Sequence, residues 1–421
     1  MLKTFDFQKL PIVEIVNSII IDATKNRASD IHFDPYSDSL KVRIRIDGAL
    51  VDYCVVPNEY KRNLITRVKI ISGMNITENR LPQDGAIKTS LNGVPLDMRV
   101  SSLPTNAGEK IVIRILDYSM SIQGLEMLGF TKENYDKVIK MINIPNGIIL
   151  TTGATGTGKS TTVYSILQRL NKEESNIITV EDPVEMDLPG INQVQVSSEI
   201  GLTFANVLRS ILRQDPDIIM VGEIRDDETA TIAVRASVTG HLVLSTLHTN
   251  NSLNTIERLL DMDVERYLLA ASLSGIISQK LARRLCPHCR KKVKTNPYQK
   301  HLFKKNLGID LEEIYIAGDG CEHCMNGYYG RIAIHEVLLL NDTIRDAISN
   351  SVKKEELREL VYKSDVKTLL QDGLLKVVNG LTTFEEIIKL IELDAEDVVL
   401  QKPEDNQENN NQEVQENTLI S

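Results

Sequence analysis

Residues 148–160 read IILTTGATGTGKS. A short apolar run opens the segment, and Gly153–Ser160 then matches the pattern G-x-x-x-x-G-K-[ST]. The helical stretch that follows carries apolar residues on one side, at Val163, Ile166, Leu167 and Leu170. A strand, a glycine-rich loop and a helix in this order let backbone N–H groups and the helix N-terminus point at phosphate oxygens. The segment therefore predicts a phosphate-binding loop.

The side chains of this loop have separate expected roles. Lys159 is expected to reach the β- and γ-phosphates of ATP, and Ser160 is expected to bind Mg²⁺. The residues expected to hold the nucleotide are Gly153, Ala154, Thr155, Gly156, Thr157, Gly158, Lys159, Ser160 and Thr161. The alternative is a glycine-rich turn between strand and helix that binds no ligand.

Short apolar runs alternate with helical stretches on both sides of the loop. The runs are Ile148–Thr152, Ile177–Val180, Ile218–Val221 and Leu242–Ser245. This alternation is typical of a parallel sheet with helices on both faces. Ligands of such sheets gather at the carboxyl ends of the strands.

Polar residues stand next to three of these runs. Glu181, Asp182 and Glu185 follow the second run, and Glu223 follows the third. His241 and His248 stand at the two ends of the fourth run. Glu223 is a candidate for the metal shell or for orienting the attacking water. Taken alone, each histidine is better explained by a structural role, but its position at a strand end near a phosphate site shifts the balance toward function.

Four of the five cysteines form two pairs, Cys286–Cys289 and Cys321–Cys324, each with two residues between. Two such turns supply four thiolates to one tetrahedral zinc ion. A closed shell of four sulfurs leaves no open position, so a structural Zn²⁺ site is predicted. The remaining cysteine, Cys54, is expected to be a strand residue.

The charge distribution excludes some partners. The formal net charge of the 421 residues is −10. Nine acidic residues and one lysine follow Leu390, so the rest of the chain is nearly neutral. This lacks the basic footprint of a nucleic-acid binder. We find no signal peptide and no apolar run of membrane-spanning length, and we expect a cytoplasmic protein.

The pattern along the chain predicts six regions. A helix over residues 11–26 and strands at Lys41–Asp47, Leu96–Ser101 and Lys110–Leu116 indicate an N-terminal α/β domain. The expected boundaries are 1–118 for this domain, 119–145 for a connector, 146–285 for the ATPase core, 286–330 for the zinc module, 331–400 for a helical region and 401–421 for a disordered acidic tail.

Several segments together resemble the type II secretion and type IV pilus-assembly traffic ATPases, the GspE/PulE/PilB type. The segments are GATGTGKSTT, ITVEDPVE, LPGINQVQV, GLTFANVLRSILRQDPDIIMVGEIRD, TGHLVLSTLHTN and the late CPHC, CEHC and GYYGR. The resemblance runs from about Ile12 to about Glu386. It implies an α/β fold with an N-terminal α/β (PAS-like) domain and a RecA-like P-loop ATPase domain that carries a tetracysteine zinc insert and a helical C-terminal region.

The resemblance also assigns roles to side chains. It implies that Glu223 is the catalytic carboxylate and that His241 and His248 sense the nucleotide state. It also implies that three acids lie near metal and water, namely Glu181, Asp182 and Glu185. Four arginines match family positions that meet nucleotide phosphates, namely Arg99, Arg114, Arg209 and Arg225. The alternative for Arg99 and Arg114 is a salt bridge inside their own domain. Ala154 and Thr157 replace the family's usual Pro and Ser, and neither change removes a phosphate contact.

The resemblance further implies a homo-hexameric ring that drives an inner-membrane platform protein, with peripheral membrane association through partners and no direct contact with nucleic acid. The site of action would be the cytoplasmic face of the inner membrane. The chain begins with the arginine-bearing domain, so we expect a short form without the additional platform-docking domain. The product would be a secretion pseudopilus or a type IV pilus, including one for DNA uptake. The alternatives are a retraction ATPase, a nucleic-acid-translocating ATPase and a regulatory member without turnover.

Overall fold

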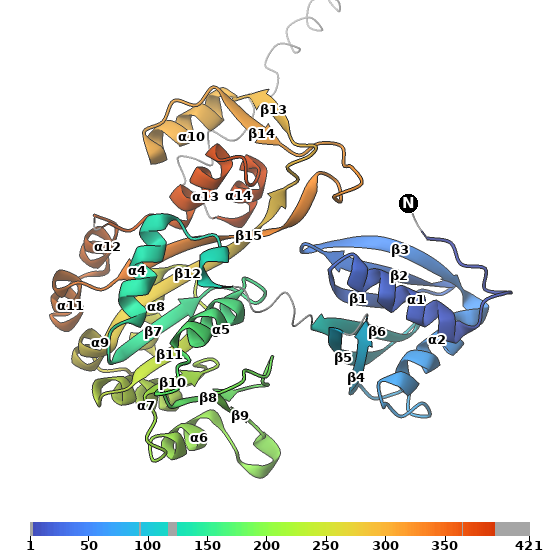
Figure 1. The fold of residues 1–421 in the computed structure, drawn as a ribbon, viewed down its shortest axis with the longest axis horizontal. Coiled ribbons are helices and arrows are strands. Elements are labelled where there is room, and N and C mark those ends of the chain that lie inside the picture. Colours follow the sequence, from blue (N-terminus) through green and yellow to red (C-terminus); the bar gives the residue numbers. More distant parts are fainter. Residues whose placement is uncertain (1–2, 92–93, 117–123, 364, 392–421) are drawn as a thin grey trace, which may run out of the picture. The chain divides into compact units, whose positions relative to one another are not determined.

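The computed structural model describes residues 3–91, 94–116, 124–363 and 365–391 (Figure 1). By their contacts the described residues separate into two compact units. The first lies within Met1–Arg283 and Tyr329–Val366, and the second within Arg284–Tyr328 and Lys367–Ser421. The first unit holds two large sheets, each with its own core, and the second holds a two-stranded sheet and helices.

The N-terminal part of the first unit is an antiparallel sheet in the order β3-β2-β1-β6-β5-β4. Its strands are β1 (Ala28–Pro35), β2 (Ser39–Ile46), β3 (Ala49–Pro57), β4 (Gln83–Leu91), β5 (Val94–Thr105) and β6 (Gly108–Leu116). Its helices are α1 (Ile12–Lys25) and α2 (Asn58–Ile71). Every second residue of β2 is buried, and these residues share one core with both helices. The predicted helix and three strands are confirmed.

A row of charged residues crosses the other face of this sheet. Arg45, Asp30, Arg114 and Arg99 are register partners on β2, β1, β6 and β5. Asp30 is buried, and its carboxylate lies 3.2 Å from Arg114 Nε and 3.6 Å from Arg45 Nε. The two predicted nucleotide-facing arginines of this domain are therefore neighbours on one face.

The second sheet has the order β15-β12-β7-β11-β10-β8-β9, and its strands from β12 to β9 run parallel. The strands are β7 (Gly147–Thr152), β8 (Ile177–Glu181), β9 (Asn192–Gln195), β10 (Ile218–Val221), β11 (Leu242–Leu247), β12 (Leu273–Leu285) and β15 (Tyr328–Leu339). Successive residues alternate between two cores: Ile148 and Leu150 belong to one and Ile149 to the other. Both faces are therefore buried, as predicted.

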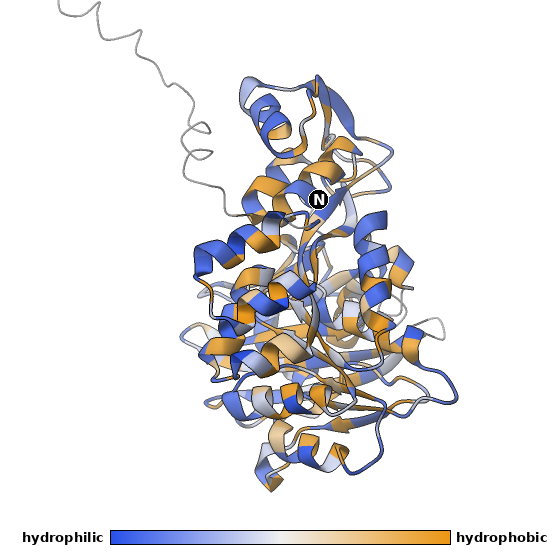
Figure 2. Cartoon of the chain, turned by 90° about the vertical axis from the view of Figure 1, so that its left-hand side faces the viewer, coloured by the Kyte–Doolittle hydropathy of each residue, from blue (hydrophilic) through white to orange (hydrophobic). Residues whose placement is uncertain are grey.

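Helices cover both faces of this sheet. The core that contains Ile149 is covered by α4 (Lys132–Ile142) and α5 (Lys159–Leu170). The core that contains Ile148 is covered by α6 (Phe204–Ile211), α7 (Asp227–Val238), α8 (Ser252–Asp261), α9 (Arg266–Ser272), α11 (Asp342–Ser349) and α12 (Lys354–Lys363). Many of the helices carry both hydrophobic and hydrophilic residues, as expected of helices with one buried side (Figure 2).

Two of the predicted boundaries differ from the structure. The region 331–400, expected to be helical, begins with strand β15, which joins the parallel strands at the edge of the sheet. The connector 119–145 contains α4, whose Val138, Met141 and Ile142 are part of the sheet's core. Strand β15 and helix α4 bury apolar side chains in the cores of this sheet, and both therefore belong to the ATPase core. The expected tail, 401–421, lies outside the described residues.

The second unit contains the predicted zinc module. Strand β13 (Lys291–Lys294) pairs antiparallel with β14 (Glu313–Ile316), and the helices are α10 (Pro297–Leu307), α13 (Leu369–Val378) and α14 (Phe384–Leu390). The rings of Phe303 and Phe384 pack with centroids 5.9 Å apart. Helix α10 begins with a capping box formed by Asn296 and Gln299.

Within the described ranges, none of the helices is both long and apolar enough to cross a bilayer.

One buried cation gives a test of the N-terminal sheet. The side chain of Lys69 on α2 is 1% exposed, and its Nζ donates to Glu109 Oε1 (2.7 Å) and to the carbonyl of Glu78 (2.6 Å). Lys69→Met would leave a half-buried carboxylate without its cation, so we expect a loss of about 3 kcal/mol. Native-state hydrogen exchange of β6 measures this loss as a lower opening free energy. The exposed Lys88 supplies the control, because Lys88→Met should change exchange by less than about 0.5 kcal/mol.

Candidate nucleotide and metal sites

The phosphate loop joins the buried strand β7 to the N-terminus of α5. Gly156 and Gly158 have φ angles of 79° and 89°, which strain any residue with a Cβ. Gly158 forms the N-cap of α5 in this left-handed conformation. The two glycines therefore allow the loop to curl around the helix N-terminus, as the sequence pattern predicted.

Lys159 holds the loop together. Its side chain is almost fully buried, and Nζ donates to the carbonyls of Gly153 (2.8 Å) and Ala154 (3.0 Å). Burial lowers the pKa of Lys159, and the negative charge of Glu223 opposes that shift. Ser160, the predicted magnesium ligand, is exposed at the first turn of the helix. A hydroxyl beside the phosphate loop can supply one oxygen to Mg²⁺.

Glu223 joins side chains from the ends of three neighbouring strands. It follows β10, and its carboxylate pairs with Arg225 and lies 3.3 Å from His248 Nε2, beyond β11. Arg225 Nη1 also lies 3.3 Å from Asp182 Oδ2, beyond β8. Because β8, β10 and β11 are parallel, their carboxyl ends meet at one edge of the sheet. The predicted residues Glu223, Arg225, His248 and Asp182 are thus brought together.

The charges around Glu223 keep it ionised. Burial by itself would raise the pKa of this carboxyl group. The hydrogen bond and charge of Arg225 outweigh burial, with a smaller contribution from His248, and the pKa stays below its ordinary value. An ionised carboxylate can accept a hydrogen bond from water and orient it.

Glu181 has a different environment. It is 3% exposed, and its Oε1 accepts hydrogen bonds from Thr179 Oγ1 (2.6 Å) and Gln193 Nε2 (3.0 Å). The hydroxyl of Tyr164 on α5 donates to the other oxygen. The same hydroxyl accepts the backbone N–H of Glu185 at 3.2 Å. These contacts favour Glu181 as the residue that positions the loop after β8.

Sequence reasoning did not identify Tyr164 and Gln193. Burial and the charge of Glu181 raise the pKa of Tyr164, so it remains a neutral hydrogen-bond donor. Both residues lie more than ten positions from Glu181 along the chain. Their spacing carries no signal that would predict these contacts.

The structure separates the two histidines. His248 lies beside Glu223, whereas His241 precedes β11 and lies at its amino end. The six residues of β11 place the two rings roughly 20 Å apart. His241 Nδ1 lies 2.9 Å from the carbonyl of Ala236 on α7. Within this chain His241 therefore links α7 to the start of β11 and lies apart from Glu223, and its part in sensing the nucleotide stays a prediction.

The four predicted arginines lie in different surroundings. Arg225 is part of the Glu223 cluster. Arg209 on α6 pairs with Glu228 at 2.5 Å. Arg114 pairs with Asp30 inside its own domain, which is the alternative that the sequence left open. Arg99 lies 3.1 Å from Glu185 Oε2, in the loop that follows β8.

A cleft of about 700 Å³ opens beside the Glu223 cluster. Its lining residues include Arg225, Asp182, Thr203, Phe204 and Glu228. The carboxyl edge of the sheet is thus accessible.

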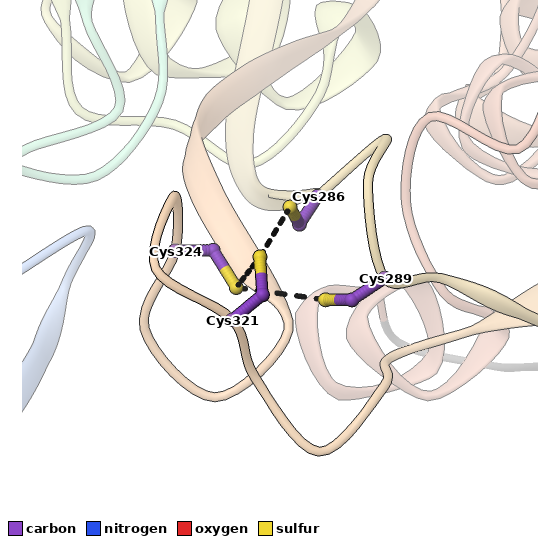
Figure 3. Close-up of side chains that lie close together, drawn as sticks. All are labelled: Cys286, Cys289, Cys321 and Cys324. Atoms are coloured by element: carbon purple, nitrogen blue, oxygen red, sulfur yellow. Dashed lines mark hydrogen bonds between the residues drawn. The ribbon is translucent and has the colours of Figure 1, made fainter.

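The four paired cysteines form a compact cluster in the second unit. Figure 3 shows their sulfur atoms pointing toward one another. The Sγ–Sγ distance is 3.7 Å between Cys286 and Cys321, and 3.6 Å between Cys289 and Cys324. Four sulfurs about 2.3 Å from one zinc ion lie about 3.8 Å apart. The donor set and its spacing therefore fit Zn²⁺. Cys54 is a buried residue of β3, as predicted, and burial raises the pKa of its thiol to about 12.

Comparisons with known proteins agree with this geometry. A family model described as Type II/IV secretion system protein matches residues 6–389. Type II secretion system protein E of Pectobacterium carotovorum is 46% identical over 381 residues, which are 90% of this chain and 76% of that protein. The type IV pilus assembly ATPase PilB of Thermus thermophilus is 47% identical over 380 residues, which are 89% of this chain and 42% of that protein.

Solved structures share the fold. The crystal structure of the pilus retraction motor PilT with bound ADP has a TM-score of 0.61 and 28% identity, and the match covers 92% of this chain and 98% of that chain. The ATPase DotB of Legionella pneumophila has a TM-score of 0.70 at 22% identity, covers 92% of this chain and 97% of its own, and shows the fold alone. The phosphate loop, the tetracysteine cluster and the match over residues 6–389 lead to one conclusion: this chain belongs to the Type II/IV secretion system protein family.

Proposed function

We propose that the chain is a motor ATPase that converts ATP and water to ADP and phosphate, and that it drives pilus or pseudopilus assembly in a type II secretion or type IV pilus system. The observation that carries the proposal is the cluster of Glu223, Arg225 and His248 at the edge of the sheet that also holds the phosphate loop. Relatives named as a type II secretion protein E and a pilus assembly ATPase support the choice of system.

Binding of ATP would use groups that are already oriented. The backbone N–H groups of the loop and of the N-terminus of α5 would donate hydrogen bonds to the phosphate oxygens. Lys159 would exchange its hydrogen bonds with the loop carbonyls for phosphate oxygens. Mg²⁺, held through Ser160, would neutralise charge on the β- and γ-phosphates.

Cleavage would depend on Glu223. Its ionised carboxylate would orient the attacking water and accept a hydrogen bond from it. Arg225 and His248 would keep this carboxylate charged and fixed in place. Glu181, saturated by hydrogen bonds, would hold the loop that carries Asp182.

The arginines would stabilise the charge that develops on the phosphates. Arg225 and Arg209 belong to the ATPase core, and Arg99 and Arg114 belong to the N-terminal sheet. Arg114 would first have to leave Asp30. An arginine that reaches the γ-phosphate contributes about 10³-fold or more to the rate. Movement of the N-terminal sheet toward ATP, and its release after cleavage, would convert hydrolysis into displacement.

The resemblance to the traffic ATPases supports the larger assembly. Six copies would form a ring at the cytoplasmic face of the inner membrane, and the ring would act on a platform protein. The tetracysteine cluster would hold one structural zinc ion and take no part in cleavage.

Lys159→Ala should reduce ATP hydrolysis to the background rate, because the loop loses the cation that reaches the phosphates. Phosphate release by the purified full chain measures the rate, and titration with fluorescent ADP measures binding. The exposed Lys172 provides the matched control, and Lys172→Ala should retain both properties. Normal turnover in Lys159→Ala would contradict the proposed role of the loop.

Glu223→Gln should bind ATP with nearly normal affinity and hydrolyse it about 10²-fold more slowly or worse, because the amide orients water poorly. Single-turnover phosphate release separates this effect from product release. Glu174→Gln makes the same change at an exposed position and should leave the rate of hydrolysis unchanged. If Glu223→Gln turned over normally, the catalytic carboxylate would have to be reassigned.

Metal analysis tests the zinc site. The purified chain should contain about one zinc ion per molecule, and Cys286→Ser should lose most of it. The change should also lower the melting temperature, because bound zinc contributes to folding. Cys54→Ala should keep its zinc. A full complement of zinc in Cys286→Ser would contradict the four-sulfur site.

A further inference from the structure

A side chain of β12 forms hydrogen bonds with the phosphate loop and with the helix that follows it. Gln279 is 1% exposed, and its Nε2 donates to the carbonyl of Thr157 at 2.7 Å. Its Oε1 accepts from Thr162 Oγ1, in the first turn of α5, at 2.8 Å. The carbonyl can only accept, so it fixes the orientation of the amide. Both halves of Gln279 are therefore used, one on the loop and one on the helix.

The bond to Thr157 determines where the next N–H points. The C=O and N–H of a planar trans peptide point in opposite directions. With the carbonyl of Thr157 directed at Gln279, the N–H of Gly158 is directed away from Gln279. Backbone N–H groups on that side are the ones that bind phosphate oxygens in such loops.

Gly158 needs this restraint. Its φ angle is 89°. Because glycine has no Cβ, its backbone can adopt more conformations than that of other residue types. A Cβ built on Gly158 would lie 3.2 Å from Gln279 Nε2, which shows how closely the amide packs on it. The glycine allows the conformation of the loop, and Gln279 selects it.

The neighbouring residue holds the other end of the loop. Ser278 Oγ lies 2.9 Å from Thr152 Oγ1, directly before Gly153. The carbonyl of Gln279 would lie 2.5 Å from a Cβ on Gly153. Strand β12 thus contacts both ends of the loop, although it is more than one hundred residues away in the sequence.

We infer that Gln279 is a positioning residue that presets the phosphate-binding N–H groups of the loop, Gly158 N–H in particular. The inference rests on the proposed nucleotide binding and extends it, because neither the loop pattern nor the family motifs quoted above include Gln279. It acts through the loop and does not touch the nucleotide itself. Its loss should therefore weaken binding of phosphate groups more than it slows cleavage.

Gln279→Met tests the inference, because methionine keeps the length of the side chain and removes both hydrogen bonds. We expect the Kd for ADP to rise about tenfold. The carbonyl of Thr157 loses its hydrogen-bond donor, and the loop loses the contact that holds its orientation. The KM for ATP should rise by a similar factor, while kcat changes less than about threefold. The Ki of inorganic pyrophosphate, measured by displacement of fluorescent ADP, should rise with the Kd, because the effect lies at the phosphates.

Thr162→Val provides a second, milder variant in case the methionine variant does not fold. It keeps the side chain of Gln279 but removes the hydrogen bond from Thr162 Oγ1 to Gln279 Oε1. The Kd for ADP should therefore rise about threefold. Gln299→Met removes a buried capping glutamine of α10 and serves as the control for general destabilisation. It should leave the Kd unchanged.

The outcomes separate the inference from the function on which it rests. A wild-type chain that binds neither ADP nor pyrophosphate would contradict the proposed function. A wild-type chain that binds both, with Gln279→Met or Thr162→Val variants whose Kd stays within about 1.5-fold of wild type, would contradict the role of Gln279 alone.

Discussion

The parallel register of β7, β11, β10 and β8 is the constraint on which the candidate site depends. Neighbouring strands run in the same direction and end at nearly the same level of the sheet. Residues far apart in the sequence therefore follow the strands at one edge. The phosphate loop follows β7, His248 follows β11, and Glu223 follows β10. The alternating apolar residues of these strands fill two cores at once and hold the sheet between its helices. The packing of the sheet therefore aligns the chemistry at its edge.

Three of the cations predicted to meet the nucleotide have partners within the chain, two at this edge and one on the N-terminal sheet. Lys159 is bound by carbonyls of its own loop, Glu223 by Arg225, and Arg114 by Asp30. A nucleotide has to replace part of these contacts, so its binding energy is reduced by the contacts that it breaks. The same arrangement keeps the charged groups of the site paired within the chain. Binding and release are consequently exchanges between alternative partners of the same cations.

Much of the fold and part of the site could be predicted from the sequence. The apolar runs of the central strands, the glycine pattern of the loop and the two cysteine pairs are local signals, and the structure contains each of them. Strand β15 was missed because His335 and Glu336 interrupt its apolar run, although both are buried. His241 precedes β11, so within one chain it lies at the opposite edge of the parallel sheet from Glu223 and His248. The roles of Tyr164, Gln193 and Gln279 could not be predicted, because each depends on a contact between distant segments.

Strand β12 combines two properties that together restrict how the sheet can move. It is buried along most of its length, and Ser278 and Gln279 point to different partners at the two ends of the phosphate loop. Slippage by one residue would turn the glutamine to the opposite face of the sheet and leave the carbonyl of Thr157 without its donor. The strand can tilt or shift together with its neighbours, but sliding along its own axis would dismantle the cradle that it supports. A conformational change that involves β12 is therefore expected to move the strand and the phosphate loop together as one rigid body.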